Sequence, residues 1–540
     1  MQYPFAFDPL YAPHPSRRLP VCARNGMVAT TSALAAASGL AMLRRGGNAV
    51  DAIVATAAAL TVLEPTSNGL GSDAFALVWS GGKLHGLNAS GPSPEAISIE
   101  AVKARHGGTA MPRYGWTPVT VPGAPAAWAE LSAKFGRLPF ADLLQPAIAY
   151  AAEGYPAPPM LAYLWGEAFG QYRKHCTSAE FEEWYRTFAP EGRAPEAGEI
   201  VRLPGHARSL EAIAQSRAED FYRGDLARRI VADSAAFGGY LAAADLAAYR
   251  PEWVEPISVR YRGYDLWEIP PNGQGIVALI ALNILKEFPL ESCDATTARH
   301  LQWEAVKLAF ADARRYVTDP RHMAVDYRQF LDPAFGAARA RAITDRAATP
   351  TVTDLPAGGT VYLCAADGEG NMVSFIQSNY MGFGSGIVVR DTGIALQNRG
   401  ADFSLEPGQA NSLLPGKKSY HTIIPGFVTK DGQAVGPMGV MGGYMQPQGH
   451  VQVLCNLVDF KLNPQQALDA PRWQWTRENR FLVESGFPVE TARQLAARGH
   501  AVDVALHDVS FGRGQMIVRL DNGVLMGATE PRSDSNIACY

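Results

Sequence analysis

Apolar residues in the first hundred positions fall into the patterns of two helices and a strand. Residues 33–45 and 49–64 are dense in alanine and leucine and carry few charges. Ser32 can cap the first of these helices, and Gly46-Gly47 is a helix-ending signal. Helices of this composition usually cover one face of a sheet, and a strand is predicted close by, over residues 74–79.

The middle of the chain repeats this alternation of helices and strands. Helical patterns cover residues 122–155, 207–216 and 298–316, and the alternation around an Arg-Gly turn predicts two strands within 257–269. Residues 171–205 are rich in charged and aromatic side chains, so we expect this segment to cover the surface.

The pattern changes near residue 345. Residues 346–359 have no period, contain two prolines and end in Gly-Gly, which is typical of an exposed linker. Two short apolar segments follow directly, 360–366 and 372–378, and the Gly/Asp/Asn-rich turn between them predicts a hairpin.

The last third of the chain predicts a second pair of strands and a helix. The strands are expected over residues 422–429 and 435–441, with a turn at 430–432. The pair Gly442-Gly443 follows, and residues 450–457 have a helical pattern. The element order predicts an α/β (α+β) protein.

Composition and charge exclude several classes of protein. Of 540 residues, 47% are hydrophobic and 19% charged, so the chain folds. The formal net charge is −4, which gives no electrostatic reason to expect nucleic acid or an anionic membrane as partner. The length suits three or four average domains, or one large intertwined unit.

The chain also lacks the usual signals for a membrane or for export. The longest apolar runs, near residues 53–62 and 276–282, fall far short of the roughly 20 residues that span a bilayer. Residues 1–20 lack a basic start followed by an apolar core, so they are not predicted to be a secretory signal. We therefore expect a soluble, cytoplasmic protein.

Familiar catalytic and cofactor motifs are missing from the sequence. The glycine-rich segment 382–386 lacks the GxGxxG spacing and a following Lys-Ser/Thr, and Phe383 removes the first glycine of a GxSxG elbow. The six cysteines form no CxxC pair, and the 11 histidines show no ligand spacing. The sequence therefore predicts neither a metal nor a cofactor.

One unusual feature remains, a threonine at the junction of the linker and the first strand of the hairpin. A threonine hydroxyl is a weak nucleophile unless a base adjoins it. If the Gly359–Thr360 bond is cut, Thr360 gains a free amine whose ordinary pKa, about 7.7–8.0, suits a general base. The glycines before it let the backbone strain, so that the Thr360 hydroxyl can attack its own preceding carbonyl. A plain Gly-Gly-Thr linker has the same composition, so this signal alone leaves both interpretations open.

The surroundings of Thr360 decide between them. Over nearly its whole length, the chain resembles the γ-glutamyltransferase family of N-terminal-nucleophile hydrolases. The stretches that carry the resemblance are residues 46–51, 121–123, 153–154, 270–275, 309–320, 368–374, 383–386, 402–404 and 442–443.

The resemblance implies a precursor that cuts itself between Gly359 and Thr360. Residues 1–359 would become a large subunit and residues 360–540 a small one. Together they would build one four-layer αββα sandwich, as a heterodimer or a dimer of heterodimers.

The resemblance also implies a catalytic set. Thr360 would be the nucleophile, with its own amine as base. Ser378 falls where the family has a second threonine and would orient the nucleophile. Gly442 and Gly443 match the paired backbone donors to the oxyanion. The non-catalytic alternatives are a polar strand end for Ser378 and a simple turn for the glycine pair.

The substrate-binding positions depart from the family pattern. Ser90 stands where γ-glutamyl enzymes have an arginine that clamps the substrate α-carboxylate. Arg399 and Asp402 occupy the positions of the groups that hold the α-amine. Tyr380 replaces an asparagine, and His421-Thr422 replace a serine pair.

These departures predict an amide that carries an acid but no amine. Arg399 can grip a carboxylate through two parallel hydrogen bonds, and it would repel an α-ammonium group. Tyr380 and His421 are bulkier than the residues they replace, which favours a small substrate. The alternative role for Arg399 is pairing with Asp402 alone.

This pattern resembles the branch that contains oxamate amidohydrolase and the cephalosporin acylases, and oxamate is the predicted substrate. The alternatives are an acylase for glutaryl-type cephalosporins and a γ-glutamyltransferase or glutathione hydrolase. A binding or scaffold protein that never cleaves itself is the alternative outside catalysis.

Overall fold

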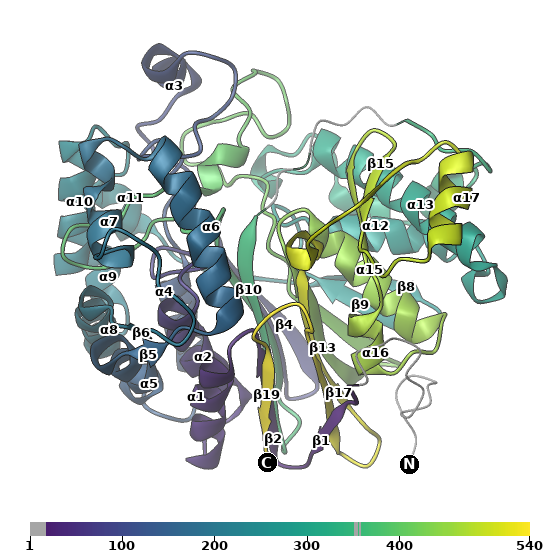
Figure 1. The fold of residues 1–540 in the computed structure, drawn as a ribbon, viewed down its shortest axis with the longest axis horizontal. Coiled ribbons are helices and arrows are strands. Elements are labelled where there is room, and N and C mark those ends of the chain that lie inside the picture. Colours follow the sequence, from purple (N-terminus) through teal and green to yellow (C-terminus); the bar gives the residue numbers. More distant parts are fainter. Residues whose placement is uncertain (1–17, 350–354, 356–357) are drawn as a thin grey trace.

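Two antiparallel sheets are stacked face to face between two layers of helices (Figure 1). The computed structural model describes residues 18–349, 355 and 358–540. Buried apolar side chains from both sheets, among them Phe75, Ile376, Phe427 and Ile517, fill the space between them. This arrangement confirms the predicted four-layer αββα sandwich, and it accounts for the alternation of helical and strand patterns along the chain.

The first sheet has the predicted hairpin at its centre. Its strands, in spatial order, are β19 (Asn536–Cys539), β2 (Gly26–Thr30), β10 (Gly359–Asp367), β11 (Met372–Tyr380), β3 (Asp73–Ser80), β4 (Lys83–Ala89) and β7 (Glu252–Val254).

Strands β10 and β11 are buried along nearly their whole length, because neighbours flank both and helices cover one face. Their register shifts between Gly359 and Val361, so Thr360 lies at a bulge. Bulges often re-aim a side chain beside an active site. The hairpin register therefore sets Thr360 apart from the regular ladder.

The second sheet faces the first. Its strands, in spatial order, are β1 (Val21–Ala23), β18 (Leu525–Thr529), β17 (Arg513–Arg519), β13 (Gln433–Met441), β12 (Gly426–Lys430), β9 (Tyr264–Glu268) and β8 (Ile257–Tyr261).

The predicted strand over 422–429 is wrong at its start, since β12 begins only at Gly426. Pro425 has no N–H for a ladder. The two N–H groups before it are held by side chains instead: Ile423 N donates to His421 Nδ1 at 3.3 Å, and Ile424 N donates to Gln446 Oε1 at 3.0 Å. Residues 423 and 424 are thereby held outside the strand ladder.

Helices of the N-terminal part lie on the outer side of the first sheet, at the left of Figure 1, some packed on its strands and others on neighbouring helices. They are α1 (Ala33–Arg44), α2 (Ala49–Leu63), α3 (Ile99–His106), α4 (Ala124–Phe135), α5 (Phe140–Glu153), α6 (Pro159–His175), α7 (Glu182–Phe188), α8 (Pro204–Ser216), α9 (Glu219–Arg223), α10 (Asp225–Ala236) and α11 (Ala243–Ala248).

The predicted cap of α1 is confirmed, because the Ser32 side chain accepts from Ala35 N. The prediction that residues 171–205 only cover the surface is wrong in part. Trp184 and Phe188 are fully buried, and both pack on Phe383, with ring centroids 5.2 and 4.5 Å away. The aromatic residues of this segment therefore belong to the core, while its charged residues remain outside.

A second layer of helices covers the other sheet, at the right of Figure 1. These helices are α12 (Gly275–Leu285), α13 (Ala295–Tyr316), α14 (Pro333–Ala340), α15 (Met445–Val458), α16 (Pro464–Asp469) and α17 (Val489–Ala497). Short strands complete the fold: β5 (Tyr155–Pro156) pairs with β6 (Ile200–Val201), and β14 (Trp473–Arg477), β15 (Arg480–Val483) and β16 (Ala501–Val504) form a small sheet.

Helix α15 begins five residues before the predicted segment, because Pro447 is tolerated in the first turn of a helix. The predicted linker over 346–359 lies partly outside the described residues. Within its described part, residues 346–349 are mostly exposed and Leu355 is buried. Among the helices of the described chain, none is both long and apolar enough to cross a bilayer.

Candidate active site

Two hydroxyl groups and one peptide carbonyl meet at the start of β10. Thr360 is 1% exposed, and its Oγ1 lies 3.0 Å from Ser378 Oγ and 2.7 Å from the carbonyl oxygen of Gly359. Ser378 Oγ also donates to that carbonyl oxygen, at 2.7 Å, and accepts from Tyr380 N at 2.8 Å. The hairpin register brings these groups together, because Ser378 and Tyr380 are on β11, beside the bulge in β10.

The glycine pair lies between β13 and α15, with both residues at positive φ, +134° for Gly442 and +58° for Gly443. A methyl group on Gly358 would stand 3.3 Å from the Gly443 Cα, so the segment before Thr360 passes close to this pair. In the first turn of α15, Gln446 Nε2 lies 3.5 Å from Thr360 Oγ1. The N-terminus of α15, with its partial positive charge, therefore lies next to the nucleophile candidate.

Arg399 is a buried guanidinium without hydrogen bonds. The side chain is 1% exposed, and no described residue accepts from its Nε, Nη1 or Nη2. The guanidinium lies over the Tyr380 ring, whose centroid is 3.9 Å from its central carbon. Burial lowers the pKa of Arg399, while nearby Tyr380, Asp402 and Asp73 act in the opposite direction. Burying such a charge lowers the stability of the fold unless an anion binds beside it.

Asp402 does not pair with Arg399 in the described part of the chain. Its Oδ1 accepts from Tyr444 Oη at 2.7 Å and from Tyr380 Oη at 3.4 Å, and Oδ2 is 3.5 Å from Arg314 Nη1. The carboxylate of Asp402 is therefore already neutralised by Arg314. The alternative that Arg399 serves only to pair with Asp402 is not what the geometry shows.

His421 is held by a carboxylate that sequence patterns did not single out. Its Nε2 lies 2.9 Å from Asp73 Oδ2, and both side chains are fully buried. Burial, followed by the charge of Arg399, holds the pKa of His421 well below its usual range, so the ring is neutral. Because Nδ1 accepts from Ile423 N, the proton is on Nε2 and points to Asp73. Burial raises the pKa of Asp73 to about 7, with Arg399 opposing this shift.

Thr422 and Ser90 complete the neighbourhood. The Thr422 carbonyl accepts from Gln274 Nε2 at 2.6 Å, and the same nitrogen donates to the Gly443 carbonyl at 2.8 Å. Ser90 Oγ donates to Asn88 Oδ1 at 2.7 Å and accepts from Asn272 Nδ2 at 3.2 Å. Ser90 is thus engaged in an amide network and replaces the expected cationic clamp with a neutral side chain.

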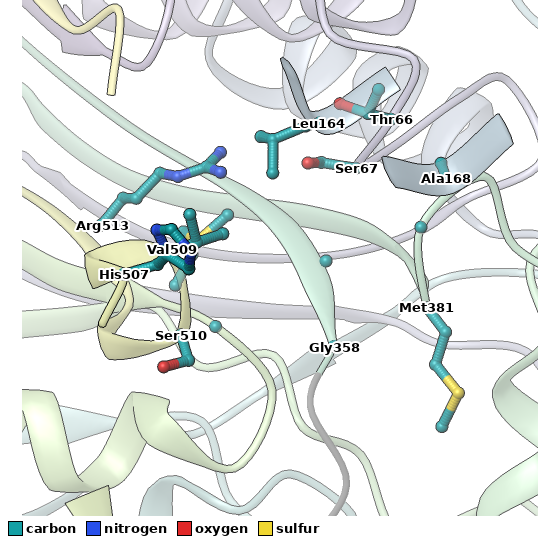
Figure 2. A pocket seen from close by; sticks show the side chains of 14 residues that line it. Thr66, Ser67, Leu164, Ala168, Gly358, Met381, His507, Val509, Ser510 and Arg513 are labelled. Carbon is teal, nitrogen blue, oxygen red and sulfur yellow. The ribbon is translucent and has the colours of Figure 1, made fainter. Parts of the chain in front are cut away.

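A pocket of about 400 Å³ opens beside the Gly358–Gly359 peptide (Figure 2). Gly442 belongs to its wall, whereas Tyr380, Arg399 and His421 do not. The remaining walls come from five parts of the chain. They are formed by Thr66, Ser67, Leu164, Ala168, Met381, Gly382, Met441, His507, Val509, Ser510 and Arg513.

Arg513 is the permanently charged side chain among the described residues of this pocket. Its Nη1 lies 3.0 Å from Glu64 Oε1, and Glu64 in turn accepts from the Thr31 hydroxyl. In Figure 2 the guanidinium extends over the pocket toward Ser67 and Leu164. Neither Arg513 nor Glu64 belongs to a motif, so the sequence alone gave no signal for them.

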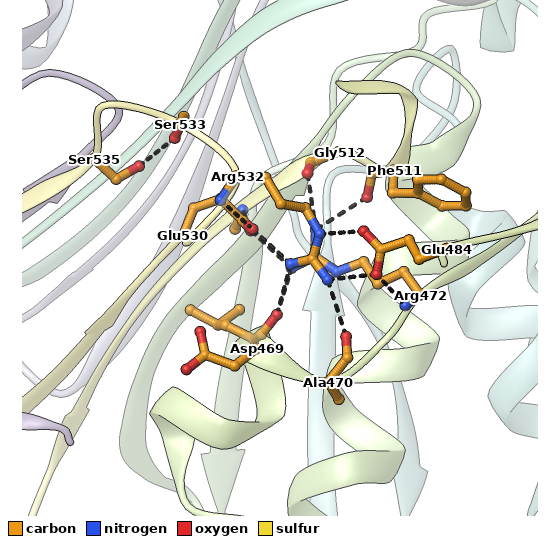
Figure 3. Close-up of polar contacts among 12 residues, drawn as sticks. Asp469, Ala470, Arg472, Glu484, Phe511, Gly512, Glu530, Arg532, Ser533 and Ser535 are labelled. Atoms are coloured by element: carbon orange, nitrogen blue, oxygen red, sulfur yellow. Dashed lines mark hydrogen bonds and ion pairs between the residues drawn. The ribbon is translucent and has the colours of Figure 1, made fainter. Parts of the chain in front are cut away.

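A buried charge network supports the loop that precedes Arg513 (Figure 3). Arg472 Nη1 donates to the carbonyls of Phe511 and Gly512, at 3.0 and 2.9 Å, and Nη2 donates to Glu530 Oε2 at 2.8 Å. Arg532 bridges Glu530 and Glu484 in the same cluster. These contacts fix one wall of the pocket.

A histidine cluster that spacing did not reveal joins α13 to the residue just before β16. His300, Glu304 and His500 present ligand atoms within 4.8 Å of one another, all buried. However, Lys307 Nζ is 2.5 Å from Glu304 Oε1 and already supplies a cation there. Lys307 also donates to the Ala348 carbonyl, so the cluster anchors the segment that leads toward Thr360.

The chain is similar to known proteins over almost all of its length. A model of the gamma-glutamyltranspeptidase family matches residues 35–540. The oxamate amidohydrolase proenzyme of Klebsiella pneumoniae is 36% identical over 538 residues, which cover 96% of this chain and 98% of that protein. The glutathione hydrolase-like YwrD proenzyme of Bacillus subtilis is 35% identical and matches 94% of this chain and 97% of its own length.

Among solved structures, the cephalosporin acylase from Bacillus halodurans superimposes with a TM-score of 0.95 at 57% identity, over 99% of both chains. These similarities extend over both sheets and over both sides of Thr360.

Proposed function

This chain belongs to the gamma-glutamyltranspeptidase family, and on that premise we propose that it is a self-processing amidohydrolase with Thr360 as its N-terminal nucleophile. Its substrates are amides whose acyl part carries a carboxylate, with oxamate as the smallest of them. The observation that carries this proposal is the meeting of Thr360 Oγ1, Ser378 Oγ and the Gly359 carbonyl within 3.0 Å.

We infer a self-cleavage reaction that this geometry supports. Thr360 Oγ1 attacks the Gly359 carbonyl carbon, the Oγ–C bond forms, and the hydroxyl proton passes to the departing Thr360 nitrogen. The hydrogen bond from Ser378 to the carbonyl oxygen supports the negative charge that develops there. Water then hydrolyses the resulting ester, which restores the hydroxyl and leaves Gly359 with a carboxylate and Thr360 with a free amine. Residues 1–359 and 360–540 thereby become the two subunits of a heterodimer.

The matured site repeats the same chemistry on a substrate. The free amine of Thr360 accepts the hydroxyl proton as Oγ1 attacks the amide carbonyl, and an acyl-enzyme forms. Gly442 and Gly443 have no side chains to block their N–H groups, and we assign these as donors to the oxyanion, each worth roughly 3 kcal/mol. The protonated amine returns its proton to the leaving nitrogen, and water releases the acid.

The charges around Tyr380 support an acidic acyl group. The three guanidinium nitrogen atoms of Arg399 have no acceptor among the described residues, and a carboxylate is the anion that this planar fork fits best. The same guanidinium disfavours the α-ammonium of a γ-glutamyl group. Tyr380, Asp402, His421 and Thr422 surround the place where this acyl part would lie, and we assign them to substrate binding.

An acylase that releases a larger amine is the second candidate. Two observations favour it: the 57% identity to the cephalosporin acylase and the pocket of about 400 Å³ beside the scissile peptide. A simple primary amide such as oxamate leaves such a pocket unused, because its leaving group is ammonia. Both candidates share the nucleophile and the acidic acyl part.

Three substrates separate these candidates from a γ-glutamyl enzyme. The processed protein is assayed with oxamate for ammonia, with glutaryl anilide for aniline, and with γ-glutamyl anilide for aniline. We expect turnover of the first two and at least tenfold lower kcat/KM for the third. Preferential turnover of γ-glutamyl anilide would contradict the assignment of Arg399.

A further inference from the structure

The pocket beside Gly358 and Gly359 is separate from Arg399, which does not belong to its lining. Gly442 lines this pocket. The next residue, Gly443, points its carbonyl to Gln274 Nε2, and the same nitrogen donates to the carbonyl of Thr422, a residue assigned to the acyl part. A substrate carbonyl whose oxygen meets the glycine pair can therefore extend in two directions. One direction leads to Tyr380 and Arg399, and the other leads into the pocket.

Arg513 gives the pocket a cationic group that neighbouring residues hold in place. The residue is 5% exposed, and its Nη1 is taken by Glu64 at 3.0 Å, while no described residue accepts from Nε. Because Nε is itself buried, Nη2 is the guanidinium nitrogen left to meet a carboxylate in the pocket. The pairing of Nη1 with Glu64 fixes the guanidinium in place for that contact.

The rest of the pocket suits an organic group of moderate size. Leu164, Ala168, Met381, Met441 and Val509 offer apolar surface, and Ser67 and Ser510 offer hydroxyl groups. Arg472 holds the Phe511 and Gly512 carbonyls directly before Arg513, so the cationic wall is rigid. Pre-organised walls of this kind reduce the entropy that binding would otherwise cost.

We propose that Arg513 is a specificity-determining residue that binds a carboxylate on the amine portion of the substrate. This inference rests on the proposed function and deepens it: the enzyme cleaves N-substituted amides that carry one acid on the acyl side, facing Arg399, and a second acid on the amine side, facing Arg513. The leaving group is an amino acid or an aromatic aminocarboxylic acid. No chemical step changes, because the protonated leaving amine and the acyl-enzyme remain as described.

A matched pair of amides tests this assignment. Glutaryl-3-aminobenzoate and glutaryl anilide share the acyl part and differ only in the carboxylate of the amine part, and N-oxalyl-3-aminobenzoate with N-oxalyl aniline forms a second pair. With the processed wild type we expect kcat/KM to be about tenfold or more higher for the carboxylated member of at least one pair. Arg513→Gln should remove that preference and leave turnover of the anilide within about threefold.

Control variants separate recognition from folding. Arg513→Gln leaves Glu64 without its cation, so Glu64→Gln combined with Arg513→Gln removes both charges and should show the same loss of preference. Arg480→Gln breaks an exposed ion pair with Asp503 and should change neither substrate. If kcat/KM decreased equally for both amides in the double variant, Arg513 would act on the acyl side or in folding, and the proposal would be overturned. An unchanged preference for the carboxylated amide would overturn it as well.

A binding experiment keeps this test independent of turnover. The pocket is present in the uncleaved chain, so the Thr360→Ala protein can be titrated with 3-aminobenzoate and with aniline. We expect 3-aminobenzoate to bind at least tenfold more tightly, and Arg513→Gln in the same background to abolish the difference. Equal binding of the two amines would overturn the assignment of Arg513. Selective binding without any amide turnover by the processed wild type would support Arg513 and contradict the proposed function instead.

Discussion

The hydroxyl oxygen of Thr360 lies 3.0 Å from that of Ser378, and both hydroxyls reach the carbonyl oxygen of the residue just before Thr360. This relationship joins two neighbouring strands at a bulge. It places a nucleophile and a hydrogen-bond donor on the same peptide bond, and no cofactor is needed for the cut that we propose.

Removal of the Ser378 hydroxyl should slow self-cleavage. Ser378→Ala deletes the donor to the Gly359 carbonyl oxygen, which carries negative charge as the peptide bond is attacked. We expect a decrease of about 10²-fold in the rate at which the full-length band disappears on a denaturing gel. Ser378→Thr keeps the hydroxyl and should mature at a rate close to wild type; equal rates in all three proteins would assign Ser378 to strand structure alone.

A side chain at Gly358 should disturb the same peptide bond sterically. A Cβ there would stand 2.8 Å from the Tyr380 carbonyl oxygen, a backbone atom that cannot move away without shifting the strand. Gly358→Ala should therefore retard maturation severely. Gly166→Ala is a suitable control for the effect of the methyl group, since nothing lies within 4 Å of its added Cβ and its φ is not positive. Normal processing of Gly358→Ala would show that the segment before Thr360 adapts freely.

Arg399 should matter for substrate and not for maturation. Arg399→Gln removes the guanidinium that we assign to the acyl carboxylate, so KM for an acidic amide should increase about tenfold or more while self-cleavage continues. Because the charge is buried and no described residue accepts a hydrogen bond from it, its removal should leave Tm unchanged or raise it. A lower Tm, or failure to mature, would instead give Arg399 a structural role.

Buried neutral histidines should make the protein sensitive to acid. Burial lowers the pKa of His206 to about 4, and neither ring nitrogen has a partner among the described residues. The unfolded chain binds this proton near pH 6.5 and the folded chain only near pH 4, so stability is lost as the pH falls through this window. By pH 5 the loss should reach about 2 kcal/mol from this residue.

His206→Gln removes this titration, which can be measured by urea unfolding of the single-chain Thr360→Ala protein at pH 7 and pH 5. We expect the decrease in unfolding free energy between the two pH values to be smaller in the His206→Gln protein. An identical decrease in both proteins would mean that His206 titrates as it does in the unfolded chain.

The sequence predicted the parts of this site that depend on local pattern and register. Gly359, Thr360 and Ser378 belong to one hairpin, and alternation with a turn signal is enough to place its strands. The glycine pair was predicted from the resemblance to the family, and both residues lie at positive φ, which favours glycine. The beginning of β12 was missed because side chains of His421 and Gln446 take the N–H groups that a strand would have used.

Contacts between distant parts of the chain could not be predicted in this way. Asp73 and His421 are 348 positions apart, and Glu64 and Arg513 are 449 positions apart. Neither pair belongs to a periodic pattern, and only the stacking of the two sheets brings them together. The charge of the pocket beside Gly359 is therefore a property of the assembled sandwich.

The most direct test of the account is the N-terminal sequence of the small fragment. Purified, active protein is separated on a denaturing gel, and each band is subjected to Edman degradation. We predict a full-length chain in Thr360→Ala and two fragments in the wild type, the smaller beginning Thr-Val-Tyr-Leu. An active wild-type protein that stays in one piece, or whose small fragment begins at any other residue, would contradict the assignment of Thr360 as the nucleophile.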